Sequence, residues 1–476
     1  MSILSQLYHS SQKQSLSLLT DFYQITMAYA YWKQQRQQQE VVFHLFFRTC
    51  PFQGGYVLAC GMEEVIEYIT NWEFLPEDLG YLRSLRGNNG AALFEEDFLK
   101  DLGKVRFTGQ LAMVPEGTPI FPNEPILRIQ GPLWQCQLLE TPLLNMVNFQ
   151  SLIATKAARI CQAAEGDAVI DFGLRRAQGF DGGLSASRAA FIGGCQGTSN
   201  VLAGKFLDIP VKGTHAHSWI MSFEDELEAF RNYAEAMPQQ SLFLVDTYDT
   251  IEGVRKAIRV GQELSEKGHE LMGIRLDSGD LVELSKESRK LLDEAGFPEA
   301  KILASNDLDE YRIQGIKQAG GKIDLWGVGT RLVTAYDQPA LGGVYKLGSI
   351  RKGEHDWHDC LKLSADSIKS TNPGMQQVRR FVENGQFQKD VLYDIRDEET
   401  WPESSFDLLQ PVLQDGAQVY QSSSIREVQE YAREQLGQLP QDVKAFKVEN
   451  DYPVELSSSL LERKRKLTEA LLAKSP

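Results

Sequence analysis

Short apolar runs alternate with helical segments through the middle of the chain. Six of these runs are AVIDFG, IPVKGTHAH, SLFLVDTY, LMGIRLDS, KILASND and DLWGVGT. Such alternation is typical of parallel βα units that close wholly or partly into a barrel. Because these runs are fewer than the strands of a full barrel, we expect an irregular or incomplete barrel, which GGVYKLGSI could complete.

Helical spacing marks a segment near the start of the chain. Tyr23, Met27 and Tyr31 recur on one face, Thr20 can cap the helix, and Asp21 lies in its first turn. The strand-like runs VVFHLFF, VRFTGQLAMV and PILRIQGP follow it. These patterns predict a mixed α/β arrangement for the first part of the chain.

A long helix precedes the alternating region. In ETPLLNMVNFQSLIATKAARICQAAEG, Thr141 fits a cap, Pro142 the first helical position and Gly166 the stop. Beyond about residue 350 the sequence is more polar and less regular, and its end, SSSLLERKRKLTEALLAK, predicts a surface helix.

Composition and charge narrow the functional classes. With 476 residues, 42% of them hydrophobic, the chain is globular and too long for a single small core, which favours two domains. A formal net charge of -16 argues against binding to nucleic acid or to an anionic membrane surface. No signal peptide or membrane span is expected, and six scattered cysteines without a CxxC pair suit a reducing cytoplasm.

Polar residues collect at the ends of the predicted strands. In a parallel barrel the carboxyl ends of the strands share one rim, where active sites form. Seven positions are expected to converge there: Asp171, His217, Asp246, Arg275, Asp277, Asn306 and Gly329.

The segment DFGLRRAQG offers a phosphate site beside an aromatic ring. Arg175 and Arg176 could bind a phosphate while Phe172 stacks on a flat ligand. Taken alone, such residues more often have structural roles: the arginine lies on the surface and pairs with a nearby acid, and the phenylalanine packs in the core.

The segment GGCQGTSNVLAG could turn free backbone N–H groups toward an anion at the start of a helix. A tight turn followed by a capped helix explains it equally well.

Two histidines alternate in GTHAHSWI. On a strand, His215 and His217 would point the same way and form a metal pair or a single reactive imidazole. A metal needs more ligands than these two, and such a pair is more often structural or catalytic in one member only. The histidine-rich HDWHDC stretch lies outside the βα units and is interpreted as a solvated loop.

GIRLDSGDL places a cation and a carboxylate on one side of a strand. Arg275 could receive a substrate acid and Asp277 could bind sugar hydroxyls, although a salt bridge within the barrel is the alternative. In LVDTYDT, Asp246 and Asp249 superficially resemble the acidic loop with which one large class of phosphoribosyltransferases binds its sugar phosphate. The segment lacks the adjacent acid pair and the following glycine of that loop, which argues against membership of that class.

Eight motifs taken in order resemble those of nicotinate phosphoribosyltransferases. They are TDFYQITM, FRTCPFQGGYVLACG, DFGLRRAQGFDGG, GTSNVLAG, GTHAHSW, LVDTYDT, IRLDSGDL and DLWGVGTRL, and the likeness continues to YPVELS. Nicotinamide phosphoribosyltransferases share this skeleton, and quinolinate phosphoribosyltransferase shares the broader fold.

The resemblance implies an α/β fold with two domains. An irregular (β/α) barrel would occupy residues 141–345. An α/β sandwich-like domain would combine residues 1–140 with residues 346–476. It also implies a homodimer with shared active sites.

The resemblance also assigns roles around the pyridine. Tyr23 of one subunit would stack on the ring opposite Phe172 of the other, and Arg275 would face the ring carboxylate. Ser199 takes the place of an aspartate found in the nicotinamide-using relatives, so a neutral hydroxyl would face the ring substituent.

The sugar and phosphate roles come from the same resemblance. Arg175 would bind the phosphate, Asp277 the ribose hydroxyls, and Gly327 and Gly329 the phosphate through their backbone N–H groups.

The implied reaction joins nicotinate to phosphoribosyl pyrophosphate with hydrolysis of ATP and with Mg²⁺ as cofactor. His217 rather than His215 would become a phosphohistidine oriented by Asp246, although the extra histidine leaves the choice between the two open. The sequence identifies no metal ligands. A catalytically inactive binding relative and a barrel aldolase are the alternatives, but no clear Schiff-base lysine follows a strand.

Overall fold

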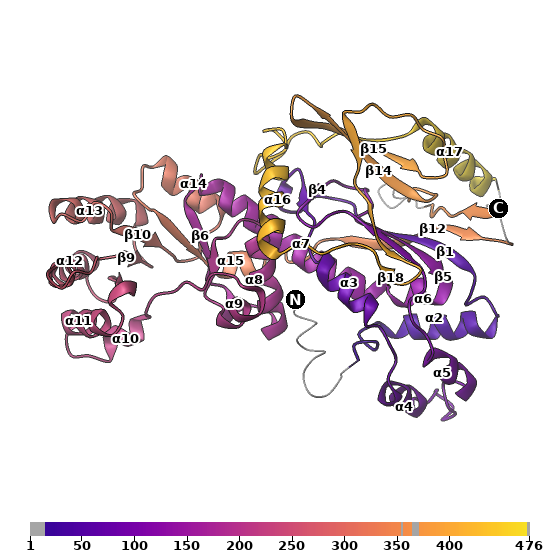
Figure 1. The fold of residues 1–476 in the computed structure, drawn as a ribbon, viewed down its shortest axis with the longest axis horizontal. Coiled ribbons are helices and arrows are strands. Elements are labelled where there is room, and N and C mark those ends of the chain that lie inside the picture. Colours follow the sequence, from indigo (N-terminus) through magenta and orange to yellow (C-terminus); the bar gives the residue numbers. More distant parts are fainter. Residues whose placement is uncertain (1–14, 354–355, 364–370, 474–476) are drawn as a thin grey trace. The chain divides into compact units, whose positions relative to one another are not determined.

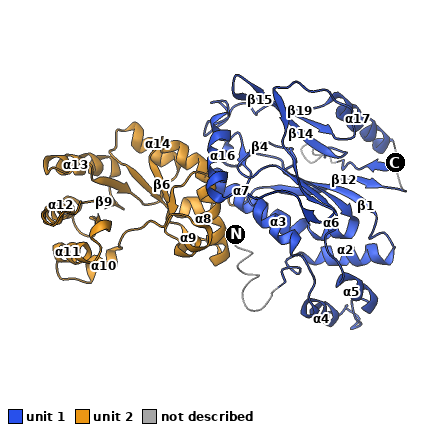
Figure 2. Ribbon diagram, viewed as in Figure 1, with its two compact units in different colours: residues 1–155, 340–476 blue, residues 156–339 orange. Residues whose placement is uncertain are grey.

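The computed structural model describes residues 15–353, 356–363 and 371–473. The chain divides into two compact units: unit 1 comprises residues 1–155 and 340–476, and unit 2 comprises residues 156–339 (Figure 2). The expectation that one domain is built from both ends of the chain is therefore confirmed.

Unit 2 is built on a parallel sheet of six strands in the order β7-β6-β11-β10-β9-β8. Of these strands, β6, β9 and β10 are labelled in Figure 1. Its strands are β6 (Ala168–Asp171), β7 (Gly197–Thr198), β8 (Leu242–Leu244), β9 (Gly273–Leu276), β10 (Lys301–Ala304) and β11 (Leu325–Val328). Most of their residues are buried, as expected of strands covered on both faces. Across residues 156–339 no ladder joins the two edge strands β7 and β8, so the sheet is an incomplete barrel.

Helices connect the strands of unit 2; α12 packs against β9, and α13 packs against β9 and β10. The helical elements are η2 (Leu174–Arg176), α8 (Gly179–Ile192), α9 (Val201–Leu207), α10 (His217–Met221), α11 (Glu226–Ala236), η3 (Pro238–Gln240), α12 (Thr250–Glu266), α13 (Leu281–Glu294), α14 (Glu310–Gln318) and α15 (Thr330–Val333).

One predicted barrel strand was wrong. IPVKGTHAH forms only a parallel bridge between Thr198 and Val211, and α10 begins at His217. Pro210 has no backbone N–H to donate to a ladder, and the pairing ends at Lys212, whose N–H donates to the carbonyl of Thr198. The sixth strand is instead β7, in a segment that had suggested a turn.

The possible closing strand GGVYKLGSI also belongs elsewhere. It contains β12 (Gly343–Arg351), which pairs antiparallel with β1 (Glu40–Phe47) in unit 1. The apolar pattern marked it as a strand, but only long-range pairing could show that its neighbour lies some 300 residues earlier.

Over its described residues, unit 1 contains three sheets. A seven-stranded sheet has the order β13-β12-β1-β5-β3-β17-β18, a four-stranded sheet the order β16-β14-β15-β19, and β2 pairs with β4. The strands not yet given are β2 (Val57–Leu58), β3 (Gln110–Met113), β4 (Pro119–Ile120), β5 (Leu127–Pro132), β13 (Trp357–Asp359), β14 (Gln376–Glu383), β15 (Gln386–Asp394), β16 (Ser405–Asp407), β17 (Gln410–Gln414), β18 (Ala417–Gln418) and β19 (Val454–Leu456).

The helices of unit 1 also come from both ends of the chain. They are α2 (Phe22–Lys33), η1 (Pro51–Gln53), α3 (Met62–Thr70), α4 (Pro76–Ser84), α5 (Glu96–Leu102), α6 (Leu133–Leu138), the first part of α7 (Glu140–Ala163), α16 (Ile425–Gly437) and α17 (Ser458–Leu472). Helix α17 is the predicted surface helix, with Leu460 as its buried residue. No described helix is both long and apolar enough to cross a bilayer.

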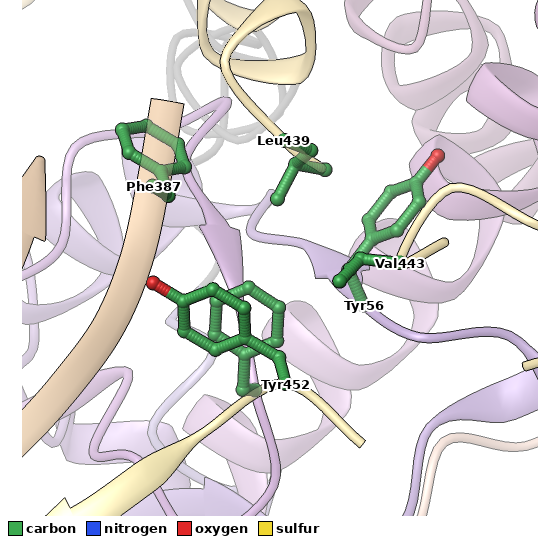
Figure 3. Packing of buried hydrophobic residues seen from close by; sticks show 6 residues of the cluster. Tyr56, Phe387, Leu439, Val443 and Tyr452 are labelled. Carbon is green, nitrogen blue, oxygen red and sulfur yellow. The ribbon is translucent and has the colours of Figure 1, made fainter. Parts of the chain in front are cut away.

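The two ends of the chain meet in a buried aromatic cluster of unit 1 (Figure 3). The rings of Phe121 and Tyr452 stack with centroids 3.8 Å apart. The guanidinium of Arg380 lies over Phe387, 4.6 Å from its centroid, and pairs with Asp390 at 2.6 Å. Because these residues belong to distant segments, neither end can complete this core alone.

Local expectations in unit 1 were partly wrong. The HDWHDC stretch is not a solvated loop over residues 357–359, which form β13, although His355 lies outside the described residues. Asp359 accepts hydrogen bonds from Ser349 and Arg396, both at 2.6 Å, which hold this strand in place.

The predicted helix starts were also shifted. Asp21, not Thr20, is the residue before the first turn of α2. Thr141 lies within α7 and donates to Asp21 at 2.8 Å.

Candidate active site

The carboxyl ends of four neighbouring strands bring together the central side chains of unit 2. The sheet order β6-β11-β10-β9 places the end of each strand beside the next. We call the resulting group the arginine cluster: Phe172 after β6, Gly327 in β11, Ser305 after β10, and Arg275 and Asp277 in and after β9. Of the seven positions expected to converge at this edge, the arginine cluster contains Arg275 and Asp277.

The guanidinium of Arg275 is held by three hydrogen bonds. Nε donates to Oγ of Ser305 at 2.9 Å, Nη1 to Oγ1 of Thr214 at 3.1 Å, and Nη2 to Oδ1 of Asp277 at 2.7 Å. Its side chain is 12% exposed. Because each nitrogen has a fixed partner, the orientation of the charge is set before any ligand binds.

Asp277 is held as a carboxylate. Burial by itself raises the pKa of Asp277, but the hydrogen bond from Ser305 and the charge of Arg275 outweigh burial and leave that pKa below its usual value. The same group therefore neutralises Arg275 and keeps an acceptor available at the strand end.

Phe172 leans across the edge of the sheet because Gly327 has no side chain. A methyl group at Gly327 would lie 2.7 Å from two ring carbons of Phe172, closer than van der Waals contact allows. Cζ of Arg275 lies 5.5 Å from the centroid of the same ring. The ring and the cation therefore form adjoining walls suited to a flat anion.

His217 faces a buried carboxylate. Its Nε2 lies 3.3 Å from Oδ1 of Asp246, and its side chain is 39% exposed while that of Asp246 is 0% exposed. The other oxygen of Asp246 accepts the backbone N–H of Asp277 at 2.8 Å and the hydroxyl of Ser278 at 2.6 Å. Asp246 thus fixes both the imidazole and the start of the loop after β9.

His215 lies in a different environment. It is 7% exposed, contacts the rings of Phe230, Tyr233 and Phe243, and accepts the backbone N–H of Leu244 at 3.3 Å. Burial lowers the pKa of His215 to about 4. The expectation that the two histidines point the same way on a strand was therefore wrong, because His217 opens a helix.

Asp171 joins β6 to the GTSN segment. Its carboxylate accepts the N–H of Gly173 at 2.8 Å and the hydroxyls of Ser187 at 2.9 Å and Thr198 at 2.7 Å. Burial raises the pKa of Asp171, although these hydrogen bonds oppose the shift. The carboxylate therefore organises the backbone from within rather than facing a ligand.

Ser199 lies at the start of the next helix. Its N–H donates to the carbonyl of Asp171 at 2.8 Å, and the side chain of Asn200 caps α9 by accepting from Ala203. The capped-helix interpretation of GTSN is thus confirmed. The role of Ser199 toward a ligand stays a prediction.

Four further predicted positions lie outside the contacts of the arginine cluster. Arg175 is exposed in η2, and Asn306 is exposed with a positive φ of 96°. Gly329 precedes α15, where a methyl group would lie 3.2 Å from the carbonyl oxygen of Phe172. Tyr23 lies on α2 of unit 1 and is 46% exposed. The ligand roles of Arg175, Gly329 and Tyr23 stay predictions.

Sequence reasoning missed three hydroxyl groups of the site. Ser305 directly follows the run KILA, Ser278 lies inside LDSGD, and Thr214 precedes His215. Asn306 was selected because it follows a predicted strand, and the same reasoning applies equally to Ser305. Serine and threonine are common at such turns for local reasons, so their pattern gave no reason to choose them.

The described residues contain no dedicated metal site. Over the described residues, no group of three or more His, Cys, Asp and Glu side chains is arranged to hold a metal ion. The protein residues of the site therefore do not form a cage for Mg²⁺, which usually binds through one or two carboxylates together with substrate phosphates.

A parallel α/β sheet with a charged, aromatic cluster at its strand ends defines an α/β enzyme with its site at the rim. Comparison with known protein families identifies the family within this class of enzymes. Family models match the N-terminal domain of nicotinate phosphoribosyltransferase over residues 18–148, the nicotinate phosphoribosyltransferase family over residues 168–391, and its C-terminal domain over residues 387–464. The chain belongs to the nicotinate phosphoribosyltransferase family.

Individual relatives are similar in sequence to this chain along nearly its whole length. Nicotinate phosphoribosyltransferase of Bacillus subtilis is 43% identical over 465 residues, covering 93% of each chain. Nicotinate phosphoribosyltransferase pncB2 of Mycobacterium tuberculosis is 39% identical over 94% of this chain and 92% of its own. The crystal structure of human nicotinic acid phosphoribosyltransferase superposes with a TM-score of 0.83 at 30% identity, covering 94% of this chain and 99% of that one.

Proposed function

We propose that this chain converts nicotinate and phosphoribosyl pyrophosphate to nicotinate mononucleotide and pyrophosphate, with hydrolysis of ATP to ADP and phosphate. This is the first step of NAD salvage from nicotinate. Family membership over nearly the whole chain supports the activity. The observation that carries the site is the fixed guanidinium of Arg275 beside the ring of Phe172.

The sugar transfer needs positioning more than acid–base chemistry. The pyridine nitrogen is already a neutral nucleophile, and pyrophosphate leaves the sugar carbon through a cation-like state resembling that of glycoside cleavage. Phe172 would hold the ring, Arg275 its carboxylate, and Asp277 the ribose hydroxyls. Arg175 and the backbone N–H groups of Gly327 and Gly329 are proposed to bind phosphate. Alignment of the two reacting centres then lowers the barrier.

ATP would enter the reaction through His217. Because an ionised carboxylate can only accept, His217 would donate its Nε2–H to Asp246 and keep its lone pair on Nδ1. Nδ1 attacks the terminal phosphorus of ATP, the bond to the bridging oxygen breaks, and ADP leaves with that electron pair. Water later hydrolyses the phosphohistidine and restores the imidazole. The exposure of His217 and the burial of His215 support this choice between the two.

Mg²⁺ is proposed to reach the site with the phosphate groups of the substrates. The absence of a ligand cluster among the described residues fits this arrangement, in which phosphate oxygens supply most of the coordination. When bound, the ion would neutralise phosphate charge.

Selectivity for nicotinate over nicotinamide is proposed to depend on Arg275 and Ser199. The guanidinium attracts the ring carboxylate, and the neutral hydroxyl of Ser199 does not repel it. An aspartate at position 199 would favour an amide instead, because it accepts a hydrogen bond from an amide and repels an acid.

We further propose a homodimer whose sites take Tyr23 from the partner subunit. Large apolar side chains are exposed on α2, at Phe22 and Met27. Others are exposed in segments that follow strand ends of unit 2, at Phe180, Val201 and Tyr248. Exposed apolar groups of this size are typical of a surface that another chain covers.

A cytoplasmic location is proposed because all six cysteines are free thiols.

The decisive experiment measures nicotinate mononucleotide formed by the purified protein, with and without ATP, and with nicotinamide in parallel. We expect product from nicotinate, more of it with ATP, and ATP hydrolysis stimulated by nicotinate with phosphoribosyl pyrophosphate. Ligand binding without product would instead identify an inactive relative. Preference for nicotinamide would contradict the proposed substrate.

A further inference from the structure

Ser305 lies between the two charged residues of the arginine cluster. It is 4% exposed, and its backbone N–H continues the sheet by donating to the carbonyl of Leu276 at 2.9 Å. Its hydroxyl accepts from Nε of Arg275 at 2.9 Å and donates to Oδ1 of Asp277. One oxygen therefore satisfies a cation on one side and a carboxylate on the other.

This arrangement uses one edge of the guanidinium. An arginine has a side edge, formed by Nε–H and one N–H of Nη2, and an end edge, formed by N–H groups of Nη1 and Nη2. Ser305 and Asp277 occupy the side edge of Arg275, and Thr214 accepts from Nη1. Within the part of the chain that the structure describes, these three acceptors use three of the five N–H groups of Arg275, and one N–H group on each Nη atom stays available for a ligand.

We propose that Ser305 is a positioning residue for nicotinate recognition: by holding Nε of Arg275 and Oδ1 of Asp277 together, it directs the end edge of Arg275 toward the carboxylate of the substrate. This inference rests on the proposed function. Ser305 itself does not touch the substrate.

The neighbouring residues explain why orientation matters here. The ring of Phe172 lies against the same guanidinium, 5.5 Å from its Cζ, so a flat substrate on this ring can meet Arg275 only in a narrow range of orientations. Without the Ser305 hydroxyl, Nε loses its acceptor and Asp277 loses a donor. The guanidinium can then turn about its remaining contacts with Thr214 and Asp277.

The first test compares Ser305→Ala with Ser285→Ala. Ser285 is another buried serine of unit 2, whose hydroxyl donates to the carbonyl of Val282 at 3.0 Å and accepts from the backbone N–H of Lys322 at 2.9 Å, away from the cluster. Ser305→Ala should raise the KM for nicotinate roughly tenfold or more, the usual effect of losing a hydrogen bond to a charged group. Its kcat at saturating nicotinate, and the inhibition constant of the neutral competitor nicotinamide, should stay within about threefold of wild type. Ser285→Ala should leave the KM unchanged.

A second pair of variants separates the hydroxyl from packing. Ser305→Thr and Ser305→Val have the same shape and differ in whether the hydroxyl is present. The threonine variant should keep a KM for nicotinate several-fold lower than that of the valine variant. Equal values for the two would overturn the inference, and so would an unchanged KM in Ser305→Ala or equal weakening of nicotinate and nicotinamide binding.

Failure of the proposed function gives a different result. In that case the wild-type chain itself forms no nicotinate mononucleotide, and the inference falls with it. An active wild type with an unaffected Ser305→Ala variant overturns the positioning role alone.

Discussion

Asp246 and His217 face each other at 3.3 Å, with the carboxylate buried and the imidazole exposed. The second oxygen of Asp246 binds the backbone N–H of Asp277. One carboxylate thus connects the proposed phosphate acceptor to the proposed ribose-binding residue. This contact gives a structural basis for linking ATP hydrolysis to sugar transfer.

His217→Ala should abolish stimulation by ATP while a basal rate of sugar transfer remains, because the imidazole accepts phosphate but takes no part in the sugar chemistry. Nicotinate mononucleotide formation with and without ATP measures this separation. Mass spectrometry of the wild type after incubation with ATP should place the phosphate on His217. Phosphate on His215, or on neither histidine, would rule out this assignment.

Ser199→Asp should weaken use of nicotinate by roughly a hundredfold or more, because two like charges about 4 Å apart repel by roughly 4 kcal/mol at an intermediate dielectric, before screening. Use of nicotinamide should hold or rise. The measurement is kcat/KM for both substrates, with Ser199→Asn as an uncharged control of similar size. If the aspartate variant handles both substrates as the wild type does, Ser199 does not face the ring substituent.

Gly327→Ala should raise the KM for nicotinate roughly tenfold, the effect expected of a modest overpacking. The new methyl would lie 2.7 Å from ring carbons of Phe172 and push the ring from its place. Gly315→Ala is the control, because a methyl there meets nothing within 4 Å. In the background of Phe172→Ala, Gly327→Ala should have little further effect, and full additivity would show that the ring is not the affected group.

Mixing inactive Tyr23→Ala and inactive Asp277→Ala proteins should restore activity if each site uses both subunits. A heterodimer can then hold one intact site, made from the unaltered Tyr23 of one chain and the unaltered Asp277 of the other. Recovered activity after subunit exchange is the measurement. Exchange that is demonstrated by mass but restores nothing would contradict shared sites.

Acid should destabilise the fold partly through His215. Burial lowers the pKa of His215 to about 4, whereas an unfolded histidine titrates near 6.5. Between these values the unfolded chain binds a proton that the folded chain does not, so stability is lost as pH falls from about 6.5 to about 4, by about 3 kcal/mol in total. Compared with wild type, His215→Phe should show a weaker dependence of urea unfolding free energy on pH in this window. Parallel curves for the two proteins would contradict the prediction.

Much of the fold could be predicted from local pattern. Five apolar runs became β6, β8, β9, β10 and β11, because strands buried on both faces are marked by continuous apolar residues. The strand predicted around His215 was wrong because the backbone pairing of this segment stops before Thr214. No local sequence pattern indicates where that pairing ends. The two-residue strand β7 is too short to be recognised by periodicity.

The sequence by itself determined the family, the parallel α/β character of the middle of the chain, and the polar residues that gather at the strand ends. These features depend on residue type and spacing, which are local. Tertiary structure decided that β12 pairs with β1, that His215 is buried while His217 meets Asp246, and that Ser305 joins Arg275 to Asp277. Each of these depends on strand order and on contacts between residues far apart in the chain, where burial and hydrogen bonding, rather than local propensity, select the arrangement.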